Sequence, residues 1–212
     1  MTSMIVTYLL DPLCGWCYGA APVLEQLAQQ TNVTVKLSPT GLFAGENGRT
    51  MNAAFADYAW SNDVRIEKLT GQRFTEVYRS HVLGRLGKRF DSALATLALT
   101  AVSLTDPLRE LDALTQLQKT RYVDGRDITD IAIVTACLDE IGLDRASVLL
   151  SREDTELNLV NQERLRQSRL LLTTYGIAGV PNLVVTDQRG SRLVDGSVLF
   201  GSLKDALSSL EQ

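Results

Sequence analysis

Two cysteines lie three positions apart in the segment Cys14-Gly15-Trp16-Cys17, between a predicted strand and a predicted helix. Residues i and i+3 at the start of a helix can bring their Cα atoms to roughly 5–6 Å, which is within the range of a disulfide. Such a pair can pass between the dithiol and the disulfide form by exchange with another thiol or disulfide. A C-x-x-C pair in a strand–helix–strand setting is typical of a redox motif. The residues therefore predict thiol–disulfide chemistry.

The two cysteines are expected to have different roles. Unpaired N–H groups at a helix N-terminus favour a thiolate over a thiol, and the more N-terminal cysteine gains most from them. We therefore expect Cys14 to be an exposed nucleophile. Cys17 lies one turn further along, on an apolar stripe, and is expected to be a shielded resolving thiol. Gly15 would allow a tight turn, and Trp16 would offer an apolar lip to an unfolded substrate.

Three other interpretations of the cysteine pair are less favoured. A zinc site needs four ligands, and the remaining soft candidates, His81 and Cys137, lie far away without paired spacing, so we predict no metal site. Two unreactive core cysteines would not be expected to end a strand and open a helix. A structural disulfide across one turn would constrain little of the chain.

The elements around the motif predict a β–α–β opening. Met4–Leu10 is a short run rich in β-branched and aromatic residues, and Asp11-Pro12 ends it. From Cys17 to residue 28 the apolar positions repeat with helical spacing, and Pro22 should kink this helix or mark an irregular first turn. Residues 32–38 alternate like a second strand. This order implies a parallel pair with a right-handed crossover.

The character of the chain changes between residues 41 and 151. A glycine-punctuated loop (41–48) leads into a long region with helical periodicity, clearest over 92–104 and 129–141. We expect four or five helices here and little strand. The chain then returns to a mixed pattern, with a polar helix over 152–175, strands over 182–186 and 191–194, and a short helix over 202–210.

Without the helical region, the remaining elements have the order βαβ–αββα, which is that of a thioredoxin-like domain. The sequence thus predicts an α/β protein. Its thioredoxin-like domain is formed by residues 1–40 and 152–212, and residues 41–151 form an inserted helical domain.

The segments DPLCGWCYGAAP and GVPNLVV together resemble the DsbA-like branch of the thioredoxin superfamily, and DPLCGWCYG is most similar to FrnE-type predicted protein-disulfide isomerases. The resemblance extends over essentially the whole chain and implies a thioredoxin-like fold with a large helical insertion. It makes Cys14 the attacking and Cys17 the resolving cysteine. It also implies that Val180-Pro181 is a cis-proline loop that binds an extended substrate peptide beside Trp16.

The resemblance implies a thiol–disulfide oxidoreductase or protein disulfide isomerase. Its substrates would be proteins or small molecules that contain a disulfide or thiols, and a separate redox partner would recycle the pair. No cofactor is implied beyond the Cys14–Cys17 disulfide, with glutathione a candidate reductant. The Gly-Trp dipeptide, where periplasmic DsbA has Pro-His, argues against a strongly oxidising role.

Two further function classes remain open. A glutathione-dependent transferase or isomerase of the kappa class has a similar inserted-helix architecture, but usually carries serine at the position of Cys14 and needs no Cys17. A metal-binding or chaperone-like module would use the apolar groove without redox turnover. Neither the metal-binding nor the chaperone-like version has a positive signature beyond the cysteines.

The composition narrows the choice further. The chain has 212 residues, 45% apolar and 22% charged, which is incompatible with a disordered chain. Its formal net charge of −4 gives no sign of the basic surface that nucleic acids require. No run approaches the roughly 18 apolar residues of a membrane span. The segment before Cys17 contains no Lys or Arg, unlike a secretory signal, so we expect a cytoplasmic protein.

Several other residues have a structural interpretation. Cys137 is expected to be a small buried hydrophobe, and His81 a surface or core histidine in a helical stretch. Asp11 could perturb the titration of the cysteines by its charge, or only cap the following turn. The loop 41–48 is expected to flank the cysteines rather than bind phosphate. A charged group is expected to form a solvated helix face: Glu163, Arg164, Arg166 and Arg169.

Overall fold

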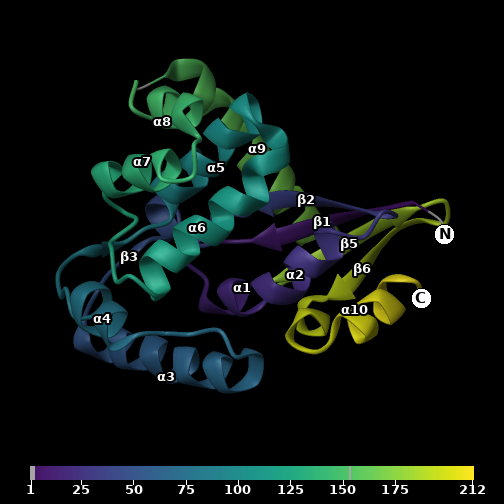
Figure 1. Ribbon diagram of the computed structural model, residues 1–212, viewed down its shortest axis with the longest axis horizontal. Coiled ribbons are helices and arrows are strands. Elements are labelled where there is room, and N and C mark those ends of the chain that lie inside the picture. Colours follow the sequence, from purple (N-terminus) through teal and green to yellow (C-terminus); the bar gives the residue numbers. More distant parts are fainter. Residues whose placement is uncertain (1–2, 153) are drawn as a thin grey trace.

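The computed structural model describes residues 3–152 and 154–212 (Figure 1). Its main sheet has four strands in the order β2-β1-β5-β6. The strands are β1 (Met4–Leu10), β2 (Val33–Pro39), β5 (Asn182–Asp187) and β6 (Gly190–Asp195). β2 runs parallel to β1, whereas β5 is antiparallel to β1 and β6 is antiparallel to β5. The predicted α/β class and the parallel β–α–β opening are confirmed.

The central strand β1 determines where the cysteines lie. It pairs on both sides, with Val6 opposite Val35 of β2 and Val185 of β5. On one face of β1, Val6, Tyr8 and Leu10 are fully buried. On the other face Leu9 is fully buried, whereas two residues nearer the start of the strand are only partly buried. The strand ends directly before the turn that leads to the cysteine pair.

The helix after β1 is divided in two. Helix α1 (Gly15–Gly19) contains the second cysteine, and α2 (Ala21–Ala28) begins after a break at Ala20. Pro22 lies in the first turn of α2, where its missing N–H costs no helical hydrogen bond. The irregular first turn predicted from Pro22 is therefore confirmed.

The region between the two halves of the sheet is mainly helical, as predicted, but its helices are more numerous and some are short. Within the described residues its α-helices are α3 (Ala53–Thr70), α4 (Glu76–Tyr78), α5 (Ala93–Thr105), α6 (Glu110–Tyr122), α7 (Ile131–Asp139) and α8 (Asp144–Leu150). Two short strands, β3 (Arg49–Thr50) and β4 (Arg89–Phe90), pair with each other. A three-residue helix such as α4 is too short to produce a helical repeat in the sequence. The division of the chain at residues 40/41 and 151/152 stays a prediction.

The last helices complete the layers around the sheet. They are α9 (Thr155–Thr174) and α10 (Leu203–Leu210). Figure 1 shows α2 and α10 in front of the sheet and α9 behind it. The predicted helix over 152–175 begins later, where Asp154 accepts a hydrogen bond from the N–H of Leu157 at 2.8 Å, and residue 153 lies outside the described residues. No helix of the described part is long and apolar enough to cross a membrane.

The prediction of a solvated face on α9 is wrong for Arg164. Its guanidinium donates a hydrogen bond to the carbonyl oxygen of Leu37 on β2 at 2.9 Å and forms an ion pair with Glu110 on α6. The two charged side chains are only 17% and 11% exposed. Burial raises the pKa of Glu110, and the charge of Arg164 opposes that rise. Arg164 thus joins α9, β2 and α6, whereas Arg166 forms an exposed pair with Glu163 as expected.

Replacement of Arg164 should therefore destabilise the fold much more than replacement of Arg166. Arg164→Ala would leave the carboxylate of Glu110 buried without its partner, and we expect the free energy of unfolding to fall by about 3 kcal/mol. Arg166→Ala, two residues further along the same helix, should change it little because its ion pair is exposed. Urea unfolding of both variants measures the difference. Equal losses in the two variants would contradict the structural role of Arg164.

Candidate active site

Cys14 lies at the junction between β1 and α1. It is the N-cap residue of α1, with extended backbone angles (φ −83°, ψ 116°). Its N–H donates to the carbonyl oxygen of Asp11 at 3.0 Å, and its own carbonyl accepts from the N–H of Tyr18 at 3.1 Å. All three cysteines of the chain, including Cys17 and Cys137, are free thiols. The tight turn thus fixes Cys14 directly after the buried central strand.

The expectation that Cys14 is exposed is wrong, because only 7% of the residue is accessible. Helix α3 packs against α1, and together with the 41–48 loop and β4 it encloses a cavity of about 150 Å³ next to the thiol. The lining is mainly apolar and aromatic, and consists of Leu13, Cys14, Gly15, Trp16, Phe43, Phe55, Tyr58, Ala59, Asn62, Asp63, Ile66, Tyr78, Phe90 and Tyr122. The inserted helical region therefore covers the cysteine that local sequence alone would leave open.

Cys17 is shielded, as predicted, with 1% of the residue accessible. Burial raises the pKa of its thiol well above the ordinary value, and the neighbouring Cys14 raises it further through a hydrogen bond and its charge. The hydroxyl of Tyr8 donates to the carbonyl oxygen of Cys17 at 3.2 Å and holds the first turn of α1 on the sheet. The two thiols therefore differ: Cys14 borders the cavity, whereas Cys17 is buried more deeply and stays protonated.

Asp11 both caps the turn that follows it and affects the titration of a cysteine, the two roles considered from the sequence. Its buried carboxylate accepts hydrogen bonds from the N–H of Leu13 at 2.9 Å, the N–H of Phe43 at 3.0 Å and the hydroxyl of Ser92 at 2.7 Å. It therefore caps the turn before Cys14 and also fixes the 41–48 loop. Burial raises the pKa of Asp11 while these hydrogen bonds lower it. The charge of Asp11 contributes to the raised pKa of Cys17.

The loop before β5 lies against the first cysteine. The Val180–Pro181 peptide bond is cis, which confirms the expectation drawn from the family resemblance. The Sγ atom of Cys14 donates to the carbonyl oxygen of Val180 at 3.6 Å. The side-chain amide of Asn182 donates to the carbonyl oxygen of Gly179 at 2.9 Å and accepts from the N–H of Gly196 at 3.2 Å, which ties the loop to the segment after β6. The structure thus brings Cys14 and Val180 together across 166 positions of sequence.

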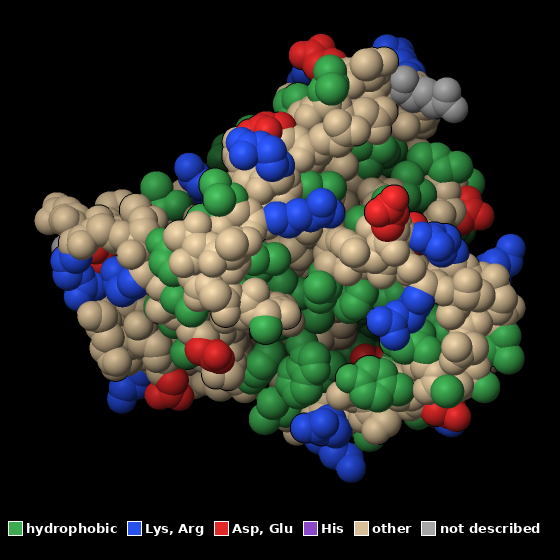
Figure 2. Space-filling model, turned by 180° about the vertical axis from the view of Figure 1, so that it is seen from behind, with side chains coloured by type: hydrophobic (Ala, Val, Ile, Leu, Met, Phe, Trp, Pro, Cys, Tyr) green, Lys and Arg blue, Asp and Glu red, His purple; other side chains and the backbone are tan. Residues whose placement is uncertain are grey.

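Trp16 lies half-buried at the rim of the same cavity. Its ring packs against that of Phe200, with a centroid distance of 5.1 Å. Figure 2 shows the back of the molecule, where hydrophobic side chains gather in the lower middle of the face, with Lys and Arg side chains around them. A partly buried tryptophan on apolar surroundings fits the predicted lip, and its role in substrate binding stays a prediction.

Asp63 is a site residue that the sequence analysis missed. It lies on α3, is 4% exposed, and accepts a hydrogen bond from the hydroxyl of Tyr78 at 3.1 Å. A Cβ atom at Gly15 would lie 2.5 Å from its Oδ1 atom. Gly15 is part of the helix α1, whose backbone any residue can adopt, so the need for glycine comes from this close approach and not from a tight turn. Burial raises the pKa of Asp63 to about 7, although Tyr78 and Arg121 lower it.

A buried arginine lies behind Asp63. The guanidinium carbon of Arg121 lies 5.5 Å from the ring centroid of Tyr78, 5.3 Å from that of Phe90 and 5.7 Å from that of Tyr122. These cation–π contacts partly replace the hydration that Arg121 loses on burial. The hydroxyl of Tyr122 donates to the carbonyl oxygen of Leu13 at 2.8 Å, so α6 contacts the turn that precedes Cys14.

Two residues with suitable chemistry lie apart from this cavity. Cys137 is fully buried on α7, as predicted, with its sulfur 3.3 Å from the hydroxyl of Thr120. Burial raises the pKa of the Cys137 thiol. His81 is exposed in a π-helical turn (Arg79–Leu83). Neither residue is part of the cavity wall beside Cys14.

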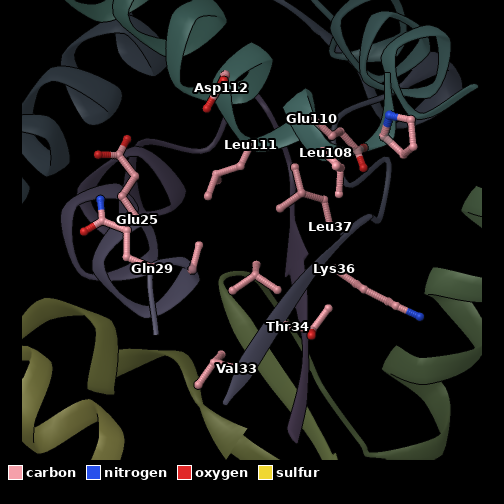
Figure 3. Close-up of a pocket in the computed structure, with 13 residues that line it drawn as sticks. Glu25, Gln29, Val33, Thr34, Lys36, Leu37, Leu108, Glu110, Leu111 and Asp112 are labelled. Carbon is pink, nitrogen blue, oxygen red and sulfur yellow. The ribbon is translucent and has the colours of Figure 1, made fainter. Parts of the chain in front are cut away.

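A larger cavity, of about 750 Å³, lies at the outer edge of the sheet (Figure 3). Glu25 of α2 and Gln29 directly after that helix form one side. Thr34 and Lys36 of β2 form another, and the segment around Leu108 forms the third. No cysteine lines it. Because thiol–disulfide exchange requires a reactive sulfur, we assign the chemistry to the smaller cavity.

Comparisons with known proteins agree with this geometry. The model of a family described as DSBA-like thioredoxin domain matches residues 5–208. The cytosolic disulfide reductase DsbM from Pseudomonas aeruginosa has 28% sequence identity and a TM-score of 0.86, covering 98% of this chain and 97% of that one. The same protein with GSH gives a TM-score of 0.81 at 28% identity, with the same coverage of 98% and 97%. A candidate protein disulfide isomerase from Nitrosomonas europaea has 23% identity and a TM-score of 0.80, covering 99% and 96% of the two chains. No curated protein matches the sequence.

The raised pKa of Asp63 predicts a specific pH dependence of stability. An unfolded aspartate titrates near 4, so between about pH 4 and 7 the folded protein holds a proton that the unfolded chain has lost. The free energy of unfolding should therefore fall as pH rises, with a contribution of up to about 1.4 kcal/mol per pH unit that ends above pH 7.

Asp63→Asn removes this contribution, so its stability relative to the unsubstituted protein should improve from pH 5 to pH 7. Urea unfolding at several pH values measures the difference. Asp57→Asn is the matched control, because Asp57 is exposed on the same helix, and its curve should run parallel to that of the unsubstituted protein. A parallel curve for Asp63→Asn as well would show that Asp63 titrates normally.

Proposed function

Since this chain belongs to the family of DSBA-like thioredoxin domains and is a thiol–disulfide oxidoreductase of that family, we propose that it works in the cytoplasm as a disulfide reductase or isomerase. In this proposal Cys14 attacks, Cys17 resolves, and Trp16, Val180 and Pro181 contact the substrate. The observation that carries it is the placement of Cys14 between the deeply buried Cys17 and the carbonyl oxygen of Val180, on a mainly apolar cavity. The narrower likeness to FrnE-type predicted isomerases rests on DPLCGWCYG and is part of the same proposal.

The reaction follows thiol–disulfide exchange. The thiolate of Cys14 attacks one sulfur of the substrate disulfide, the substrate S–S bond breaks, and the departing thiolate takes up a proton. The sulfur of Cys17 then loses its proton and attacks Cys14, which releases the second substrate thiol and leaves a Cys14–Cys17 disulfide. Two electrons pass from the protein to the substrate, and the reverse sequence oxidises a dithiol.

The burial of Cys17 supports its role as the resolving thiol. While Cys14 is reduced, burial and the adjacent Cys14 both raise the pKa of Cys17. Cys17 therefore does not compete with Cys14 for the substrate. Once Cys14 is bound in a mixed disulfide, its negative charge is gone and one cause of the raised pKa of Cys17 disappears. The second attack is therefore favoured only after the first has occurred.

The apolar rim of the cavity favours the binding of substrates that have an exposed hydrophobic or extended segment. Trp16 packs against Phe200 at this rim, and in this proposal the backbone of Val180 pairs with an extended peptide. DsbM, at 28% identity, has been solved with GSH, and we propose glutathione as a reductant or as part of a small disulfide substrate here. A separate protein or thiol would recycle the pair.

The reducing direction is supported by two observations. The similar DsbM protein is named a cytosolic disulfide reductase. A cytosolic glutathione poise of about −220 to −320 mV keeps redox pairs that exchange with it mainly reduced unless their own potential is lower. Under that poise the dithiol form is available to attack substrate disulfides.

A glutathione redox series tests the function directly. We expect a reversible two-electron transition confined to Cys14 and Cys17, with Cys137 unchanged because it is fully buried. The samples are quenched with acid, and modified cysteines are counted by mass. A midpoint near −270 mV would support the reducing direction, whereas one near −120 mV would indicate an oxidant. Absence of a reversible transition would overturn the proposal.

Single cysteine variants separate this function from that of a glutathione transferase. Cys17→Ser should stop turnover and accumulate a mixed disulfide of glutathione on Cys14, visible by mass, because no resolving thiol remains. Cys14→Ser should form no such adduct, and Cys137→Ser is the control that should behave like the unsubstituted protein. Conjugation of glutathione to an electrophile that survives Cys17→Ser would favour the kappa-class alternative instead.

A further inference from the structure

The carboxyl group of Asp63 is a buried acid that the mechanism above does not use. It lies in the middle of α3, yet it contacts the backbone of the redox motif, since a Cβ atom on Gly15 would lie 2.5 Å from Oδ1. Gly15 directly follows Cys14, and Asp63 and Cys14 line the same cavity of about 150 Å³. The acid therefore borders the same cavity as the Cys14 thiol, although it is 49 positions from Cys14 in the sequence.

The two oxygens of this carboxyl group differ. Oδ2 accepts the hydrogen bond from Tyr78, whereas no donor in the described part of the chain is bonded to Oδ1. Asp11, the other buried acid near the cysteines, has both oxygens engaged by Leu13, Phe43 and Ser92. Asp11 is therefore fully used in holding the fold together, while Asp63 keeps one oxygen open for a proton.

The surroundings of Asp63 suit proton transfer. Burial raises its pKa to about 7, so near neutral pH the group is present both as acid and as base. The mainly apolar walls, which include Phe55 and Phe90, keep the cavity poor in other proton acceptors. A thiol that ionises there needs an acceptor close at hand.

We propose that Asp63 is a proton-transfer residue of the redox reaction, which accepts the proton of the Cys14 thiol and returns it to the departing sulfur. The inference rests on the proposed function and deepens it. As the Cys14 sulfur forms its bond to the substrate, the carboxylate of Asp63 takes the Cys14 proton. The substrate S–S bond breaks, and the acid form of Asp63 protonates the leaving thiolate. Protons and electrons balance, and Asp63 ends the step as it began.

Other titratable groups face Asp63 from each neighbouring element. They are Cys14 before α1, Tyr78 on α4, Arg121 and Tyr122 on α6, and Tyr58 on α3 itself. Burial raises the pKa of Tyr78 and Tyr122 well above the ordinary value, so both stay neutral between pH 5.5 and 8.5. Arg121 stays charged over that range. Among the residues that line this cavity, Asp63 is thus the carboxyl group that changes charge over this range.

The rate of oxidation of the reduced protein by glutathione disulfide, measured from pH 5.5 to 8.5 by acid quench and mass, tests this role. Asp63→Asn should slow the reaction at pH 7 on the order of 100-fold and remove the inflection near that pH. Asp57→Asn on the exposed side of α3 should match the unsubstituted protein. An Asp63→Asn variant with the rate and pH profile of the unsubstituted protein would overturn the proposal.

Tyr78→Phe distinguishes proton transfer from a structural role. It keeps the carboxyl group but removes the hydrogen bond that lowers the pKa of Asp63, so the inflection should move to higher pH. A merely structural Asp63 would leave the position of the inflection unchanged in this variant. The Tyr78→Phe profile decides the question even if Asp63→Asn does not fold.

Infrared difference spectra give an independent readout. In the unsubstituted protein, the C=O band of a protonated carboxyl group should disappear as pH rises through about 7, and Asp63→Asn should lack this change. A missing band in the unsubstituted protein would overturn the role of Asp63. A protein in which Cys14 and Cys17 show no reversible exchange at all would instead overturn the proposed function, so the two failures are distinguishable.

Discussion

The buried carboxylate of Asp11 is the interaction on which the site depends. A charge without hydration is tolerated only when hydrogen bonds replace the lost water. Its three donors come from the turn before Cys14, from the 41–48 loop at Phe43, and from Ser92 before α5. The carboxylate is satisfied only when these distant segments meet at the end of β1. The cysteine turn and the inserted helical region are therefore held together as one unit.

The covered cysteine pair follows from that arrangement. With the loop fixed at Phe43 and α3 packed on α1, Cys14 borders a small cavity instead of open solvent. Apolar walls strengthen every charge interaction within the cavity, because little water screens it. Loss of hydration on burial is the largest contribution to the raised pKa values of both Cys17 and Asp63. The inserted region thus sets the electrostatics of a motif that lies outside it in the sequence.

The sequence predicts the parts of this structure that are local. The strand Met4–Leu10, the irregular helix at Pro22 and the cysteine pair follow from residue types and spacing, and the family resemblance adds the loop at Pro181. Helical periodicity, however, shows which face of a helix is buried and not what it meets. From the sequence alone Arg164 is predicted to be solvated, because its partner Glu110 is 54 positions away. Nothing in the local sequence distinguishes Asp63 from other helical acids, since only the tertiary fold places it at the cavity beside Cys14.

Gly15 shows why motif and insertion cannot be understood separately. Its place in a helix gives no conformational reason for glycine, and the reason lies in Oδ1 of Asp63, which occupies the space that a side chain at position 15 would need. Any larger residue at position 15 would have to displace that carboxyl group, while Ile66 on the same helix also limits the space. The absence of a side chain at Gly15 and the position of the Asp63 carboxyl group therefore depend on each other. A change of the dipeptide would alter the environment of Cys14 by moving α3 as well as by its own chemistry.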